Sequence, residues 1–288
     1  MTYNFIKMQG TGNDFVMIDG RNRTITDHSG LAQKLCDRHF GIGADGLILI
    51  LPAEDENNDF RMRIFNADGS EAEMCGNGIR CVTHFLRLQK MSSEKIFSIE
   101  TKAGIIKPEI IDYNEKQSQV KVNMGSPAFV PEEIPVNIEM NTESVFNFKL
   151  ITQAEEFIIN CVSMGNPHSI IFRKSLEDIQ LTSWGKKIEN HPLFPEKTNV
   201  EFVKIINERE IELKVWERGS GITLACGTGA CASVVAGIKQ GHLNQAEDIS
   251  VHLPGGDLTV NWSGKDVYMT GPATTVFKGE IGVIEEEI

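Results

Sequence analysis

The sequence has 288 residues, of which 41% are hydrophobic, and this is enough for one large domain or two ordinary ones. Its 28 Lys and Arg residues are outnumbered by 40 Asp and Glu residues and form no cluster, so neither a nucleic acid nor an anionic membrane is expected as a partner. The apolar run Leu47 to Leu51 is too short to span a bilayer, and the N-terminus lacks the apolar segment of a secretory signal. We therefore expect a cytoplasmic protein whose six cysteines are thiols, without a disulfide framework.

The first half of the chain reads as strands interleaved with two helices. A turn-rich loop, Gly10 to Asp14, precedes an apolar strand at 15–18. Gly41 to Gly46 fits the GxGxxG pattern, but a strand (47–51) follows it where a dinucleotide site requires a helix, so we interpret it as a tight loop. Apolar spacing predicts helices over 29–39 and 75–90, and strands at 60–65, 96–100, 104–111 and 119–123.

The second half opens in a similar way, because Gly165-Asn166-Pro167-His168 also leads into an apolar strand. We place the domain boundary near residue 119, just before a segment rich in turn residues. A helix is predicted over 175–190, and another over 230–239 that is apolar nearly all round and should be buried on all sides. Strands are predicted at 146–151, 157–162, 197–202, 211–216, 249–253, 258–262, 266–270 and 275–278, which completes an α+β chain.

One stretch occurs twice. Residues 66–78 align without a gap with residues 217–229, and each copy lies between an alternating strand-like run and an apolar helix-like run. Both copies end in Cys-Gly-x-Gly, at Cys75 and Cys226. The duplication predicts two domains, 1–118 and 119–273, each carrying one of these cysteines.

A cysteine at the start of a helix lies beside unpaired backbone N–H groups, which favour its thiolate and lower its pKa from about 8.5. Such a cysteine is a usable base. The neighbouring glycines let a ligand approach the same N–H groups, which can hold a carboxylate or a phosphate. If the two halves meet across a cleft, Cys75 and Cys226 lie on opposite sides of one bound anion, a geometry suited to moving a proton from one face to the other.

Four other interpretations account for parts of this pattern. Cys75/Cys81 and Cys226/Cys231 as zinc ligands have looser spacing than structural zinc sites. Gly227 to Ala232 fits GxGxxA, so a phosphate ligand at this helix end stays open, although no βαβ pattern supports a nucleotide site. A single cysteine nucleophile paired with His168 leaves the second copy unexplained. Cysteines that only pack in a core do not account for the glycines beside them.

With both motifs assembled, the chain resembles the diaminopimelate epimerase family over essentially its whole length. The resemblance is carried by Met8 to Phe15, Phe65 to Ser70, Cys75 to Gly78, Gly165 to His168, Thr198 to Glu201, Glu217 to Gly219, Ala225 to Gly229 and Met269 to Gly271. It implies interconversion of LL- and meso-diaminopimelate, in lysine and peptidoglycan synthesis, without pyridoxal phosphate, any other cofactor or a metal. Proline racemases and phenazine-biosynthesis isomerases share the duplicated fold.

The resemblance also assigns roles to individual residues. It implies that Cys75 and Cys226 are the two bases, and that His168 and Glu217 tune their pKa values. It implies that the diamino-dicarboxylic acid is held by Asn13, Asn66, Gly76, Asn77, Asn166, Asn199, Glu217, Arg218, Gly227 and Thr228. Some members have Gln where this chain has Gly46, so a substrate contact there is absent or replaced.

The family fold consists of two pseudo-symmetric domains, each a barrel-like mixed sheet around a central helix, with the active site in the cleft between them. The resemblance implies that the C-terminal strand, within 274–288, returns to the first domain. It also implies a homodimer with Tyr268 at the subunit contact.

Overall fold

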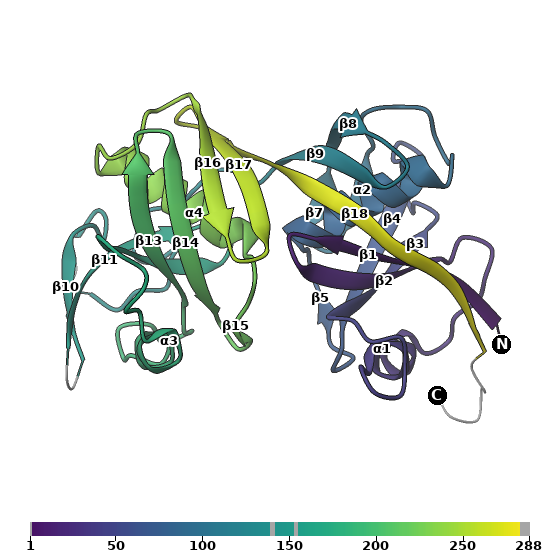
Figure 1. The fold of residues 1–288 in the computed structure, drawn as a ribbon, viewed down its shortest axis with the longest axis horizontal. Coiled ribbons are helices and arrows are strands. Elements are labelled where there is room, and N and C mark those ends of the chain that lie inside the picture. The colour runs from purple at the N-terminus through teal and green to yellow at the C-terminus, as the bar shows by residue number, and fades with distance from the viewer. Residues whose placement is uncertain (1, 139–141, 153–154, 283–288) are drawn as a thin grey trace. The chain divides into compact units, whose positions relative to one another are not determined.

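The computed structural model describes residues 2–138, 142–152 and 155–282. Within these residues the chain forms four helices and a large mixed sheet (Figure 1). Contacts divide it into two compact units, Met1–Val122 with Thr270–Ile288, and Asn123–Met269, called units 1 and 2 below. None of the helices in the described ranges is long and apolar enough to cross a membrane.

Unit 1 has a sheet covered by one helix on each face. Its elements are β1 (Thr2–Gly10), β2 (Asn13–Asp19), α1 (His28–Cys36), β3 (Gly46–Leu51), β4 (Phe60–Asn66), β5 (Glu71–Ala72), α2 (Gly76–Leu88), β6 (Ile99–Thr101), β7 (Gly104–Ile106), β8 (Glu109–Tyr113), most of β9 (Gln117–Asn123) and most of β18 (Val267–Gly282). The parallel strands β2 and β3 are buried on both faces, as expected for strands covered by helices. Val16 and Leu47 face α1, while Ile48 lies under the first turn of α2.

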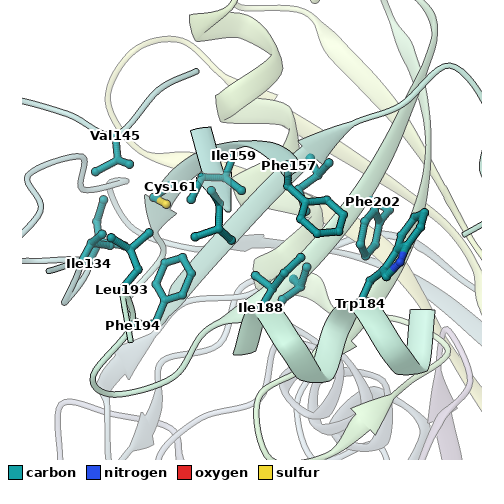
Figure 2. Close-up of a cluster of buried hydrophobic side chains, with 14 of the residues drawn as sticks. Ile134, Val145, Phe157, Ile159, Cys161, Trp184, Ile188, Leu193, Phe194 and Phe202 are labelled. Carbon is teal, nitrogen blue, oxygen red and sulfur yellow. The ribbon is translucent and has the colours of Figure 1, made fainter. Parts of the chain in front are cut away.

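Unit 2 is built in the same order. Its elements are β10 (Phe148–Ile151), β11 (Glu156–Ser163), β12 (Pro167–Phe172), α3 (Leu181–Glu189), β13 (Asn199–Asn207), β14 (Glu210–Glu217), β15 (Gly221–Ile222), α4 (Gly227–Lys239), β16 (Asp248–Leu253) and β17 (Gly256–Trp262). Figure 2 shows the core beneath α3, where Trp184 and Ile188 lie beside Phe157, Ile159 and Phe202 of the sheet. The helix α4 contacts β11, β12, β13 and β17, and its middle turns are fully buried.

The pairing registers of the two units match residue by residue. Phe15 pairs with Gly46 in the parallel ladder of unit 1, as His168 pairs with Asn199 in unit 2. Ile48 pairs with Ile64 and Glu201 with Val215 in the antiparallel ladders that follow. Both helices that follow the duplicated turn have 13 residues. The registers therefore make Phe15 equivalent to His168, Ile48 to Glu201, and Asn13 to Asn166.

Several local predictions differ from the structure. The helix predicted over 175–190 begins only at Leu181, because Leu176 and Ile179 reach the same core from a turn. The strand predicted at 104–111 is divided into β7 and β8 around Pro108, which has no N–H for a sheet ladder. The strands predicted at 266–270 and 275–278 form one strand, β18. The first strand, β1, was not predicted, and neither were the two-residue strands β5 and β15 inside the two copies of the polar turn.

The long strand β18 pairs with β1 in unit 1, from Thr274 to Gly282 (yellow in Figure 1). The remaining residues of the predicted C-terminal strand, 283–288, lie outside the described residues. His84 of α2 ties this strand to the helix, because its Nε2 lies 3.0 Å from Thr275 Oγ1 and its Nδ1 lies 2.7 Å from Ser118 Oγ. The ring is fully buried, and burial lowers the pKa of His84 to about 4.

We predict that His84 makes the protein less stable in mild acid. The unfolded chain binds a proton near pH 6.5 and the folded chain only near 4, so the contribution is complete above pH 6.5 and is lost as the pH falls toward 4, by roughly 3 kcal/mol. Urea unfolding at pH 7 and pH 4.5 measures the loss. In His84→Gln, whose amide can bond both hydroxyls, this part of the decline should disappear; an equal decline in both proteins would contradict the prediction.

Candidate functional site

Each unit starts its central helix with a cysteine as the N-cap residue. Cys75 and Cys226 have extended backbone angles (φ −142°, ψ 118° and φ −121°, ψ 113°), as N-cap residues do. Their sulfur atoms accept hydrogen bonds from Gly78 N–H and Gly229 N–H, each at 3.4 Å. The sulfur thus takes the place of the oxygen that Ser, Thr, Asp or Asn supplies at other helix starts.

In unit 1 the Cys75 sulfur faces an asparagine from the β1–β2 turn. The Cys75 thiol donates to Asn13 Oδ1 at 3.6 Å, and Asn77 Nδ2 donates to the same oxygen at 3.5 Å. The other end of the Asn13 amide donates to Asp45 Oδ2 at 2.8 Å. Asn13 is therefore held with its oxygen toward the sulfur.

Asp45 belongs to a charged cluster that supports this turn. Arg38 bonds both Asp14 (2.9 Å) and Asp45 (2.7 Å), and Lys7 lies 2.8 Å from Asp14. Burial opposes the ionisation of Asp14, but the hydrogen bonds from Arg38 and Lys7 outweigh it and lower the pKa of Asp14 to about 2. Asp14 stays ionised at neutral pH, and the cluster fixes the turn that carries Asn13.

In unit 2 the Cys226 sulfur is linked to a longer chain of polar side chains. Thr228 Oγ1 lies 3.4 Å from Cys226 Sγ and accepts from Asn166 Nδ2 at 3.3 Å. Asn166 Oδ1 lies 3.0 Å from His168 Nε2, and His168 Nδ1 lies 2.7 Å from Glu201 Oε1. Both ring nitrogens of His168 are therefore occupied, and within unit 2 its link to the sulfur runs through Asn166 and Thr228.

The prediction that a helix start lowers the cysteine pKa is wrong for Cys226. Cys226 is only 5% exposed, and burial raises its pKa well above the usual value. The negative charge of Glu217, and that of Glu201 when it is ionised, raises the pKa further, whereas the Thr228 hydroxyl and Gly229 N–H lower it by a smaller amount. In this state Cys226 holds its proton at neutral pH.

The duplicated polar turn of unit 2 brings three more predicted residues together. Asn199 donates from Nδ2 to Pro167 O at 2.8 Å and accepts from Arg218 N–H at 2.9 Å, so it joins two loops. Glu217 accepts from the Thr223 hydroxyl. The Arg218 guanidinium donates to Glu196 O at 3.1 Å.

Asn66 is less closely connected than the other predicted residues of unit 1. Its Nδ2 donates to Ser70 Oγ at 2.9 Å, within its own turn. Gly76 and Asn77 form the first turn of α2, within the predicted helix, whereas α4 begins at Gly227, three residues before the predicted range 230–239. Across the described ranges, no three His, Cys, Asp or Glu side chains are grouped as a metal site would require.

The family model for "Diaminopimelate epimerase" matches residues 5–130 and 160–276. The chain belongs to the diaminopimelate epimerase family. A family member from Halothermothrix orenii is 60% identical over 286 residues, which cover 99% of this chain and 100% of the relative. Another from Carboxydothermus hydrogenoformans is 54% identical over 96% of this chain and 98% of the relative.

Solved structures at low identity share the fold. A phenazine biosynthesis protein of the PhzF family from Bacillus anthracis has a TM-score of 0.70 at 18% identity, over 98% of this chain and all of that chain. A hydroxyproline epimerase from Agrobacterium vitis, with bound trans-4-hydroxy-L-proline, has a TM-score of 0.69 at 14% identity, over 97% of this chain and 92% of that chain.

Sequence reasoning missed several supporting residues. Glu201 and Asp45 were not singled out. Glu201 is bonded to His168, the neighbour of the predicted Asn166, and Asp45 is bonded to the predicted Asn13 itself. Glu189 accepts from Trp216 Nε1 at 2.8 Å and from Gly219 N–H at 3.0 Å, and so supports the 217–219 turn. A charged residue inside the apolar strand that begins at Asn199 was a signal for Glu201, because a fully buried carboxyl group needs a partner.

We predict that Gly229→Ala destabilises the protein by about 1–3 kcal/mol, because a Cβ there lies only 2.7 Å from Glu201 Oε1, which is buried and bonded to His168. Gly78→Ala is the matched control, since its Cβ meets two side-chain methyl groups at 3.0 and 3.1 Å that can shift slightly. Thermal unfolding of both variants measures the difference. Equal losses of stability would contradict a rigid Glu201.

Proposed function

We propose that the protein interconverts LL- and meso-diaminopimelate as a cofactor-independent epimerase, in lysine and peptidoglycan precursor synthesis in the cytoplasm. The observation that carries the proposal is that a cysteine caps the central helix in both units of a chain from this family. One acid and one base are what inversion at a carbon requires. A protein that only bound the substrate would need neither.

The reaction removes a proton from the α-carbon of an amino acid, which is a very weak acid. Negative charge moves onto the carboxylate as the proton leaves, so groups that bind the carboxylate more strongly in the transition state lower the barrier. The backbone N–H groups in the first turns of α2 and α4, at Gly76/Asn77 and Gly227/Thr228, are donors of this kind. They take the place of a cofactor's electron sink.

The two cysteines then work as a pair. In one direction the thiolate of one cysteine takes the α-proton and the thiol of the other delivers a proton to the opposite face; in the reverse direction the roles exchange. This requires the two units to present Cys75 and Cys226 to opposite sides of one carbon, in the cleft of two barrel-like sheets around central helices. In the substrate-free protein Cys226 carries its proton, in keeping with its raised pKa.

The remaining predicted residues bind the substrate in this proposal. Arg218 pairs with the distal carboxylate, which suits the planar fork of a guanidinium. Glu217 balances an ammonium group, and Asn13, Asn66, Asn166 and Asn199 donate or accept around the two ends of the substrate. Glu217 acts on Cys226 directly, through its charge, and His168 acts through Asn166.

We also propose that the protein is a homodimer with Tyr268 at the contact. Tyr268 lies on β18 and is 38% exposed, and exposed aromatic side chains are enriched at protein interfaces.

We predict that Cys75→Ala and Cys226→Ala each lower epimerisation of LL-diaminopimelate by roughly 10³-fold or more while the protein still folds. The measurement is α-proton exchange in deuterated water together with formation of the meso isomer, with circular dichroism as the test of folding. Cys81→Ala is the matched control, because Cys81 is a fully buried cysteine of α2 away from the helix start. Near wild-type exchange and inversion in either single variant would sink the two-base proposal.

The same assay, run with proline and trans-4-hydroxyproline, tests the substrate. Exchange with diaminopimelate alone is expected. Faster exchange with either imino acid would reassign the activity to that of the proline racemases.

We predict that Tyr268→Asp converts the dimer to monomers, because a charge buried at a subunit contact without a partner is costly. Sedimentation velocity gives the mass of the particle. Ile151→Asp, at a 62% exposed position of β10, is the control and should leave the mass unchanged. A wild-type protein that sediments as a monomer, or a Tyr268→Asp variant that stays dimeric, would contradict the assignment.

A further inference from the structure

The two units differ at one pair of equivalent positions beneath the helix starts. In unit 1 these positions hold Phe15 and Ile48, two apolar residues buried under α2. In unit 2 the equivalent positions hold His168 and Glu201, two ionisable residues that are both fully buried. The fold of unit 1 is built without a polar pair at this place, so the scaffold itself does not require one. The pair in unit 2 needs another explanation.

Glu201 is bonded to the ring nitrogen of His168 that does not face Asn166. Its Oε1 lies 2.7 Å from His168 Nδ1 and 2.7 Å from where a Cβ on Gly229 would be, so the carboxyl group lies between the ring and the first turn of α4. Glu201 Oε2 is buried and has no hydrogen-bond partner among the residues that the structure describes. A bare ionised oxygen there would cost more than a protonated carboxyl group. Burial also raises the pKa of Glu201, in the same direction.

Protonation of the Glu201 carboxyl group determines the tautomer of His168 and the orientation of the Asn166 amide. If Glu201 donates to Nδ1, that nitrogen is the acceptor and Nε2 carries the ring hydrogen. Nε2–H then donates to Asn166 Oδ1, and the Asn166 amide nitrogen points to Thr228 Oγ1. Because Thr228 Oγ1 accepts from Asn166, its own hydrogen is available for the Cys226 sulfur, 3.4 Å away.

The equivalent asparagine of unit 1 is held the other way round. Asp45 accepts from Asn13 Nδ2, so Asn13 turns its oxygen toward Cys75. His168 donates to Asn166 Oδ1, so Asn166 turns its nitrogen toward Thr228 and the Cys226 side. The partner of the amide, an acceptor in unit 1 and a donor in unit 2, decides which group each asparagine presents.

We propose that Glu201 is a positioning residue for the reaction: it fixes His168, which orients the Asn166 amide so that the Thr228 hydroxyl donates to the Cys226 sulfur. This inference rests on the proposed function, in which Cys226 becomes a thiolate once it has delivered its proton. This thiolate is buried, and the negative charge of Glu217 on β14 disfavours it further. The donors from Thr228 and Gly229 offset that cost.

The test compares Glu201→Gln with Glu201→Leu. Neither variant can ionise at position 201, and only Gln can donate to His168 Nδ1 as the protonated carboxyl group does. We expect Glu201→Gln to keep kcat/KM near the wild-type value and Glu201→Leu to lose about tenfold or more, by the same factor in both directions because the equilibrium between substrate and product is unchanged. Ile48→Val, at the equivalent position of unit 1, is the control and should keep its activity.

A second measurement needs no substrate. In a Cys75→Ala background, the ultraviolet absorbance of the Cys226 thiolate is followed as the pH rises. The thiolate should appear at higher pH with Glu201→Leu than with Glu201→Gln, because only the Leu variant frees the Asn166 amide to turn. This titration separates the inference from the proposed function, which is tested by the activity of the wild-type protein alone.

A third variant distinguishes a loss of positioning from a loss of stability. His168→Phe combined with Glu201→Ile places the residues of unit 1 at the equivalent positions of unit 2. We expect this protein to unfold at a temperature near that of the wild type and yet to lose activity as Glu201→Leu does. If Leu and Gln variants match in both activity and Cys226 titration, or if the Phe/Ile protein is fully active, Glu201 does not act by positioning.

Discussion

A sulfur atom that accepts a hydrogen bond from the first turn of a helix is the interaction on which this protein depends. The first four N–H groups of a helix have no partner inside the helix, and they carry the positive end of its dipole. Cys75 and Cys226 each accept from one of these N–H groups, at 3.4 Å. In the proposed reaction, the same geometry places a proton-transfer group and a carboxylate site within one turn.

The two units keep this helix start and change what surrounds it. Their ladders share one register, and the asparagines that meet the helix starts come from equivalent turns. The polar residues that hold the asparagines differ: a charged cluster of Asp45, Arg38 and Asp14 in unit 1, and the buried His168–Glu201 pair in unit 2. In the proposed two-base reaction the two cysteines have different protonation states at any moment, so a strictly symmetric pair of sites would serve it poorly. The two units share one backbone arrangement, and the different polar residues that hold their asparagines give the two sulfurs different surroundings.

Much of this was predictable from the sequence, for reasons that particular residues make clear. Local rules were sufficient where one residue fixes the conformation: the helices after Cys75 and Cys226 begin at the motif, and the all-apolar helix near 230–239 is buried as expected. The helix predicted over 175–190 was too long because apolar spacing at Leu176 and Ile179 reports burial, and a turn buries them equally well. The anchors of the asparagines were beyond prediction, since Glu201 lies 33 residues from His168 and Asp45 lies 32 from Asn13. Only the parallel pairing of the strands brings them together.

The raised pKa of Cys226 is the result that local reasoning had wrong, and it bears on the chemistry. A low pKa makes thiolate abundant but a weak base, whereas the α-carbon of an amino acid holds its proton far more tightly than a free thiol does. Burial and the Glu217 charge strengthen Cys226 as a base and reduce its population of thiolate at the same time. Donors that act on the sulfur after it has lost its proton ease that conflict, because they lower the energy of the thiolate without exposing it to water. The Gly229 N–H, 3.4 Å from the sulfur, is such a donor, and the Thr228 hydroxyl becomes one only if Asn166 faces it with its nitrogen. In the proposed role, the buried His168–Glu201 pair therefore determines how well the Cys226 thiolate is stabilised. This is a reason for an ionisable pair to occupy the positions that Phe15 and Ile48 occupy in unit 1.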